Sequence, residues 1–132
     1  MRTLIALVLI APALVAGCGG GGYASSRTTA ASSAAAPAPG SHRLTATESE
    51  YKIVLSASSV PAGKYAIDAV NKGTIDHALA VNGPGTAGTQ TSTISPGASQ
   101  TLAVTLTKGT YDLYCPVPGH KALGMDVKLT VT

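Results

Sequence analysis

The sequence predicts an all-β fold, an antiparallel sandwich or barrel built from short strands. From Leu44 to the C-terminus, apolar residues recur at every second position, which is the period of a half-buried strand and not of a helix. Turn-forming combinations of Gly, Pro and Asn interrupt this pattern at short intervals. The expected strands cover residues 51–55, 64–70, 78–81, 101–106, 110–114 and 127–131.

Turn signals separate these strands in order along the chain. Val-Pro-Ala-Gly at 60–63 and Asn-Lys-Gly at 71–73 flank the second strand, and Gly-Pro-Gly at 83–85 ends the third. Ser-Pro-Gly at 95–97 precedes the fourth strand, and Lys-Gly at 108–109 separates the fourth from the fifth. Thr47 and Glu50 match a helix capping box, but the β-branched alternation after them argues against a helix.

The N-terminal residues 1–17 are expected to form an export signal. Residues 4–16 are apolar apart from Pro12, and this run is too short to span a bilayer but typical of a signal peptide. Small residues then precede Cys18, and this segment resembles the lipobox of bacterial lipoproteins. The resemblance implies that Cys18 is lipidated and anchors an exported protein to the bacterial cell membrane, facing outward or into the periplasm. The alternative is an ordinary export signal followed by an unrelated cysteine.

A tether is expected over residues 18–43, because this segment is rich in Gly, Ala, Ser, Thr and Pro and has no regularly spaced apolar positions. His42 falls in it and is expected to be solvated. One small folded domain remains, residues 44–132. The whole chain has nine basic and six acidic residues, a net charge of +3. Such a weak and scattered charge excludes the basic patch of a nucleic-acid-binding protein.

The folded domain lacks Phe and Trp, so its core must be aliphatic and its stability modest. If Cys18 is lipidated, Cys115 has no cysteine to form a disulfide with, and a lone cysteine in an exported domain needs an explanation. A bound metal would account for the cysteine and would add stability.

Candidate metal donors cluster in one segment between two expected strands. Cys115, His120 and Met125 follow one another with four residues between consecutive donors, and the Pro and Gly residues in these intervals allow a loop to turn all three toward one centre. A second histidine, His77, opens the strand 78–81, which can lie beside strand 110–114. Thiolate, imidazole and thioether donors suit copper in both oxidation states, and two His, one Cys and one weak Met form the ligand set of blue-copper centres.

From about residue 44 to 132 the chain resembles the cupredoxins, small blue-copper proteins of the plastocyanin and azurin kind. The resemblance rests on His77, on the Cys-x4-His-x4-Met loop and on the turns at 71–73 and 95–97. It implies a Greek-key β-sandwich or barrel of about seven or eight strands that binds one copper ion. It also implies that His77, Cys115 and His120 are the trigonal ligands and Met125 the long axial ligand. The expected role is single-electron transfer, not enzymatic catalysis, by a monomer that meets membrane-bound or periplasmic redox proteins.

Position 78 departs from the family pattern, because the residue after the first histidine is often an Asn that ties the two ligand loops together, and here it is Ala78. Pro116 has no N–H, whereas Val117 keeps one. The backbone N–H groups of Ala78 and Val117 are therefore candidates to hydrogen-bond the Cys115 sulfur, which is one lever on the redox potential of a blue-copper site.

Other functions explain fewer of these residues. A Cys-His nucleophilic enzyme leaves Met125 unexplained, and a structural zinc site would not recruit a thioether. The Gly-x-Gly-x-x-Gly pattern at 83–88 is not followed by a helical period, which a dinucleotide site requires. An extracytoplasmic copper-binding protein for delivery, storage or resistance stays open as the alternative to an electron carrier. The resemblance also implies that His120 is exposed within an apolar ring, to which residues 117–119, Leu123 and the 83–85 loop could contribute.

Overall fold

The computed structural model describes residues 39–132, so the expected signal, Cys18 and most of the expected tether lie outside the described residues. Nine strands and one short 3-10 helix make up this part of the chain. The strands are β1 His42–Ser49, β2 Lys52–Leu55, β3 Ser59–Val60, β4 Gly63–Asn71, β5 Ala80–Asn82, β6 Thr89–Gln90, β7 Ser99–Leu106, β8 Gly109–Tyr114 and β9 Asp126–Val131, and the helix is η1 Lys121–Leu123.

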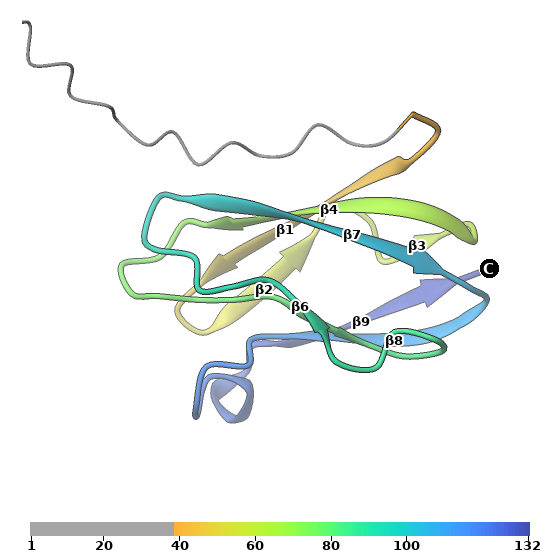
Figure 1. Cartoon of the computed structure of the whole chain (residues 1–132). Coiled ribbons are helices and arrows are strands. Elements are labelled where there is room, and N and C mark those ends of the chain that lie inside the picture. Colours follow the sequence, from red (N-terminus) through yellow and green to blue (C-terminus); the bar gives the residue numbers. More distant parts are fainter. Residues whose placement is uncertain (1–38) are drawn as a thin grey trace, which may run out of the picture.

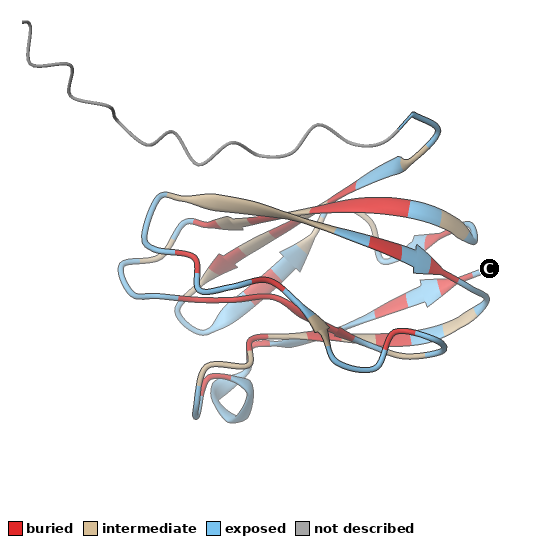
Figure 2. Ribbon diagram, viewed as in Figure 1, coloured by how far each residue is buried: buried red, intermediate tan, exposed pale blue. Residues whose placement is uncertain are grey.

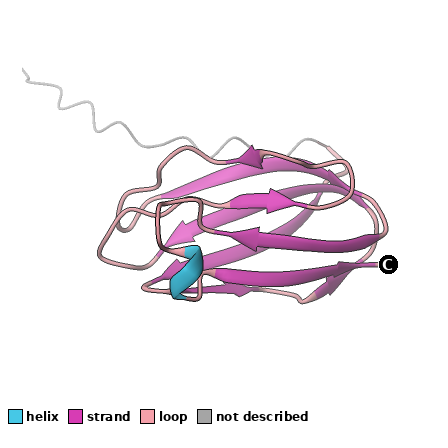
Figure 3. Cartoon of the chain, turned by 90° about the horizontal axis from the view of Figure 1, so that it is seen from below, coloured by secondary structure: helices cyan, strands magenta, loops and turns pink. Residues whose placement is uncertain are grey.

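The strands form two sheets that pack face to face as a β-sandwich, as Figure 1 shows. One sheet has the order β2-β1-β4-β7, and the other has the order β3-β9-β8-β5-β6. The all-β sandwich expected from the sequence is confirmed. The single helical turn, η1, lies in a loop at one end of the molecule (Figure 3).

The expectation of purely antiparallel pairing is wrong, because both sheets are mixed. β1 pairs with β4 in parallel, and β3 pairs with β9 in parallel. After β1 the chain reverses into β2, crosses to the second sheet for β3, and returns as β4 along the other side of β1. This long connection is what parallel neighbours require. Alternation within single strands does not reveal it, since both kinds of pairing bury every second residue.

β1 was not predicted as a strand, since the first expected strand, residues 51–55, corresponds to β2. His42, expected in the tether, is the first residue of β1, and its ring stacks on that of Tyr65 with 5.2 Å between the centroids. Along β1, Leu44, Ala46 and Glu48 point into the sandwich. Buried and exposed stretches alternate along the strands of both sheets (Figure 2). The core between the sheets is aliphatic, as expected, with Tyr65 and Tyr111 as its buried aromatic residues.

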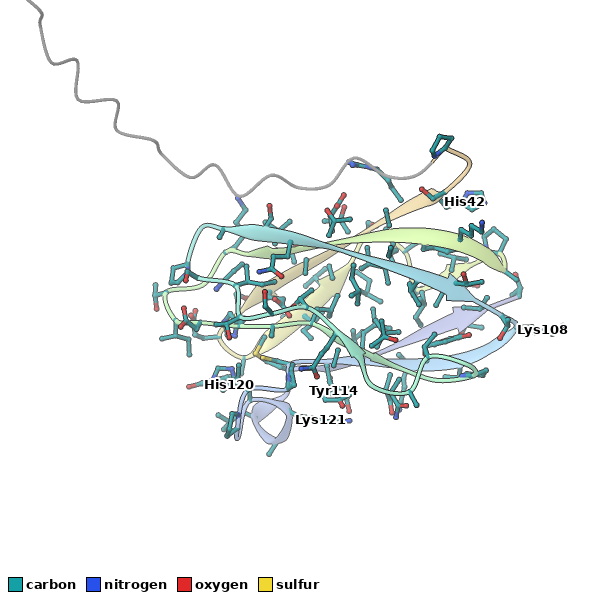
Figure 4. All side chains as sticks on the ribbon, viewed as in Figure 1. His42, Lys108, Tyr114, His120 and Lys121 are labelled. Carbon is teal, nitrogen blue, oxygen red and sulfur yellow. The ribbon has the colours of Figure 1, made fainter. Side chains whose placement is uncertain are left out.

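The two ends of the sandwich are different. At one end, the Tyr111 hydroxyl donates a hydrogen bond to the carbonyl oxygen of Pro84 at 2.9 Å and accepts one from the backbone N–H of Thr107, also at 2.9 Å. The loops between β4 and β5 and between β8 and β9 meet at the opposite end. Figure 4 shows this separation, with Lys108 at one end and His120 at the other.

Candidate metal centre

Three side chains from different segments meet at the His120 end of the sandwich. His77 lies just before β5 and forms an isolated bridge with Ile94, and Cys115 directly follows β8. β5 and β8 pair with Ala80 opposite Tyr114, so the residues that flank these two strands are brought together. His120 comes from the loop after Cys115 and precedes η1. The proximity of His77 and Cys115 expected from adjacent strands is therefore present.

The donor atoms of these residues face one another. The Nδ1 atoms of His77 and His120 are 3.2 Å apart, and the Cys115 Sγ lies 3.9 Å from the first and 3.6 Å from the second. A point equidistant from three atoms with these separations lies about 2.1 Å from each, close to the ~2.0–2.1 Å of zinc–nitrogen bonds and the ~2.3 Å of zinc–thiolate bonds in proteins. The triangle has the dimensions of a three-coordinate metal site.

Met125 completes the set of expected ligands and is fully buried. Its carbonyl oxygen accepts a hydrogen bond from the Cys115 N–H at 3.0 Å, and its own N–H donates to the His120 carbonyl at 3.2 Å. These bonds close the loop after β8, so the spacing of four residues between donors becomes a compact turn. Gly124, with φ at 118°, occupies the left-handed conformation that ends η1 just before Met125.

The site is closed to solvent to different degrees. His77 and Cys115 have no exposed surface, whereas His120 keeps 9%. The expectation of an exposed loop histidine is therefore wrong in degree, although His120 is the most exposed of the three. The ring of Tyr51 covers it edge-on, with 5.2 Å between the two centroids. Sequence reasoning gave Tyr51 no role, because it is 69 positions from His120 and no motif links them.

The apolar surroundings of His120 also differ from expectation at one loop. The 83–85 loop lies at the opposite end of the sandwich, where the side chain of Pro84 covers Gly109 and its carbonyl binds the Tyr111 hydroxyl. The error arose because the loop follows β5, whereas the site lies at the start of that strand. Val117 and Pro118 do lie beside the site, in a groove of about 390 Å³ shared with Ala78 and residues 90–93.

Neighbouring groups shift the pKa of the Cys115 thiol in opposite directions. Burial raises its pKa, while hydrogen bonds from the backbone N–H groups of Val117 and Ala78 lower it, and the charge of Glu48 raises it further. Those two N–H groups are the ones that the sequence singled out. They favour the thiolate, the form that binds metal, in a place where solvation cannot.

Burial lowers the pKa of His77, and the nearby His120 lowers it further. The imidazole is therefore neutral at physiological pH, as a metal ligand must be. Its Nδ1 faces the site, and its Nε2 is buried without a hydrogen-bond partner among residues 39–132.

Asn71 forms side-chain hydrogen bonds that hold the His77 segment in place, a role that Ala78 cannot fill. Its side-chain Nδ2 donates to the carbonyl oxygens of Ile75 and Ile94, both at 2.8 Å, and its Oδ1 accepts the Gly73 N–H at 2.8 Å. Asn71 thus joins the segment before His77 to Ile94, the residue that forms the isolated bridge with His77. The Asn-x-Gly turn was visible in the sequence, but its connection to residue 94 requires the fold.

A trigonal set of two imidazoles and one thiolate, buried at one end of a β-sandwich, defines a metal centre of the blue-copper class. The chain belongs to the plastocyanin/azurin family of copper-binding proteins, whose family model matches residues 41–132. Copper is therefore the cofactor that this fold carries, and the donor set of the described site fits it.

Solved structures share the fold at low sequence identity. Auracyanin from the photosynthetic bacterium Roseiflexus castenholzii is 20% identical, with a TM-score of 0.53 over 67% of this chain and 94% of its own. Auracyanin A from Chloroflexus aurantiacus is 19% identical, with a TM-score of 0.54 over 70% of this chain and 100% of its own. Reduced rusticyanin is 19% identical, with a TM-score of 0.56 over 73% of this chain and 82% of its own.

No curated protein sequence matches the chain. In residues 39–132, no helix has the length and apolar character needed to cross a membrane.

Proposed function

We propose that the protein is a membrane-tethered electron carrier that holds one copper ion through His77, Cys115, His120 and Met125. The observation that carries this proposal is the convergence of the His77 Nδ1, the His120 Nδ1 and the Cys115 Sγ, separated by 3.2 to 3.9 Å. When bound, copper supplies a one-electron couple between Cu(I) and Cu(II). The residues of the chain hold the ion, exclude water and keep the site unchanged between the two states.

The rigidity of the site supports electron transfer over copper delivery. A delivery site must release its metal and is expected to be open, whereas His77 and Cys115 have no exposed surface. The segment before His77 is fixed by Asn71, and the loop from Cys115 to Met125 is closed by backbone hydrogen bonds. A site that does not rearrange also lowers the cost of changing the oxidation state of the metal.

The same closure supports a carrier over an enzyme. Catalytic metal sites keep a coordination position open to substrate. Here the described face of the site is covered by Tyr51, which packs on His120, and by the loop that carries Met125. An electron can cross such a cover, whereas a substrate would have to displace it to reach the metal, and this supports a carrier.

The path of the chain suits attachment to a membrane through Cys18. β1 starts with His42 beside Tyr65, and the neighbouring register pairs Gly63 with Leu106, so the chain enters the sandwich at the end opposite His120 (Figure 4). A lipid on Cys18 would leave the copper end free to meet membrane-bound or periplasmic redox proteins. The tether raises the effective concentration of that end near such partners.

The experiment that separates a carrier from a delivery protein compares electron exchange with copper release. The copper-loaded protein is cycled by voltammetry, and in parallel it is mixed with excess chelator while the blue absorption is followed. We expect many reversible one-electron cycles before measurable copper loss. Copper that transfers to the chelator as fast as the site is reduced would instead support delivery or storage. Cys115→Ser serves as the control, because it should show neither reversible redox cycling nor blue absorption.

A further inference from the structure

Glu50 lies in the turn between β1 and β2, and its carboxylate reaches the segment that leads to His77. Its Oε1 accepts hydrogen bonds from the backbone N–H of Thr74 at 2.5 Å and of Ile75 at 3.1 Å. The Thr74 hydroxyl adds a longer contact at 3.4 Å. One carboxylate oxygen therefore fixes the two residues that stand three and two positions before the metal-site histidine.

The same oxygen faces the outer nitrogen of His77. When Nδ1 of a neutral imidazole binds a metal, the ring proton must be on Nε2. The His77 Nε2 is buried and has no hydrogen-bond partner among the described residues, and the Glu50 Oε1 lies 3.7 Å away. A buried N–H without an acceptor is costly, and a contraction of less than 1 Å would give this one a charged acceptor.

We infer that Glu50 is the positioning residue of the metal centre, which holds the His77 ring through its Nε2–H and places a fixed negative charge behind the ligand. This inference rests on the copper-binding role proposed above. Metal-bound histidines commonly donate their second N–H to a carboxylate or a carbonyl, which orients the ring and makes the ligand more basic. In this chain the acceptor comes from a turn far from the ligands in sequence.

Two further observations support the assignment. A Cβ at Gly73 would lie 2.3 Å from the Glu50 Oε1, so the absence of a side chain at position 73 is what admits the carboxylate. The N–H groups of Thr74 and of Glu50 itself hold the pKa of the carboxyl at about 2, so the group is charged at all physiological pH values. The charge is permanent, and its position is set by backbone atoms.

A negative charge behind His77 stabilises Cu(II) more than Cu(I), because the oxidised site carries one more positive charge. Glu50→Gln removes the charge but keeps an amide oxygen that can cap the 74–75 backbone and accept the Nε2–H. Glu50→Ala removes both. Asp76→Asn is the matched control, because it removes one carboxylate beside His77 from an exposed side chain that forms no hydrogen bond or ion pair with the ring within residues 39–132.

The test uses the full chain with Cys18→Ser throughout, so that Cys115 is the sole thiol. In the diamagnetic Cu(I) form, proton NMR follows the solvent exchange of the His77 Nε2–H. Voltammetry gives the reduction potential of each variant, and a chelator challenge gives its rate of Cu(II) loss. Thermal unfolding of the metal-free protein reports any purely structural effect of the turn.

For Glu50→Gln we expect Cu(II) affinity to fall about tenfold relative to Cu(I), within the range known for partners of metal ligands, which raises the potential by about 59 mV. The Nε2–H should exchange slowly in this variant and at least tenfold faster in Glu50→Ala. Asp76→Asn should shift the potential much less, since the charge of the exposed Asp76 carboxylate is screened by solvent.

A Glu50→Gln potential equal to that of Asp76→Asn would overturn the inference, as would equal Nε2–H exchange in wild type and Glu50→Ala. If Glu50→Ala does not fold, the Glu50→Gln comparison decides. Failure of the wild type to cycle would instead count against the proposed function, and the exchange measurement would still test the role of Glu50.

Discussion

Glu48 is a fully buried carboxyl, and neither of its oxygens has a hydrogen-bond partner among the described residues. It stands on β1 opposite Ile53 on one side and Asn71 on the other. Asn71 offers it no donor, because both hydrogens of that amide bind carbonyl oxygens. Desolvation raises the pKa of Glu48 from 4.5 to about 7. We therefore expect the protein to lose stability as the pH rises through this range.

The sign follows from proton linkage. Between pH 4.5 and 7 the folded chain keeps a proton on Glu48 that the unfolded chain has released, so unfolding becomes more favourable as the pH increases. One pKa unit corresponds to about 1.4 kcal/mol, so the full shift is worth about 3 kcal/mol. Between pH 5 and pH 8 the expected loss is about 2.5 kcal/mol. This is a large part of the ~5–15 kcal/mol stability of a typical domain.

The measurement is urea unfolding of the metal-free domain, residues 39–132, at pH 5 and at pH 8. Glu48→Gln removes the titration, and Glu48→Met replaces the carboxyl by an apolar side chain of similar size. Taking the difference in unfolding free energy between wild type and each variant cancels the contributions of other titrating groups. The comparison stays at pH 8 and below because Glu48 raises the pKa of the Cys115 thiol, so the titration of that thiol also differs between wild type and variants. Glu48→Met should be more stable than wild type at pH 8.

Parallel pH profiles of wild type and Glu48→Gln would refute this reasoning. They would mean that the carboxyl is solvated or paired in solution, since a group with an ordinary pKa contributes no difference between pH 5 and pH 8.

Three other outcomes are expected. Met125→Leu should still bind copper but with a higher reduction potential, because the thioether donor is lost, and an unchanged potential in voltammetry would argue against an axial role. Gly73→Ala should lower the melting temperature of the metal-free protein and speed copper loss, because its Cβ would lie 2.3 Å from the Glu50 Oε1; a variant with wild-type values would show that the turn adapts. Electron exchange with a partner should depend only weakly on salt, because Lys121 beside the site is paired with Asp126 at 3.7 Å, and a steep dependence in stopped-flow rates would contradict this.

The alternation of apolar residues predicted most strands, because each strand has one buried face. It could not predict the parallel pairing of β1 with β4, since the order of strands depends on where the chain crosses between sheets. It also missed β1, although apolar residues alternate from Leu44 onward, and it missed β3 and β6, which are two residues long and too short to show a period.

The metal donors could be found from sequence because they are chemically rare in this chain and three of them occupy one loop. Cys115 and Met125 are the sole Cys and Met after residue 18, so the folded domain offers no alternative sulfur ligands. The residues that support them are of common types and come from distant segments. Glu50 and Tyr51 reach the two histidines only because the β1–β2 turn folds over the site. The burial of Glu48 could be predicted from the sequence, because the alternation that buries Leu44 and Ala46 also buries Glu48.

Titration of the metal-free protein with Cu(II), followed by visible absorption, tests the central claim most directly. We expect an intense blue band, from charge transfer between the Cys115 thiolate and Cu(II), that stops growing at one copper per chain. Cys115→Ser should give no such band. A colourless wild-type product, or a band and stoichiometry unaffected by Cys115→Ser, would contradict the assignment of this site as a blue-copper centre.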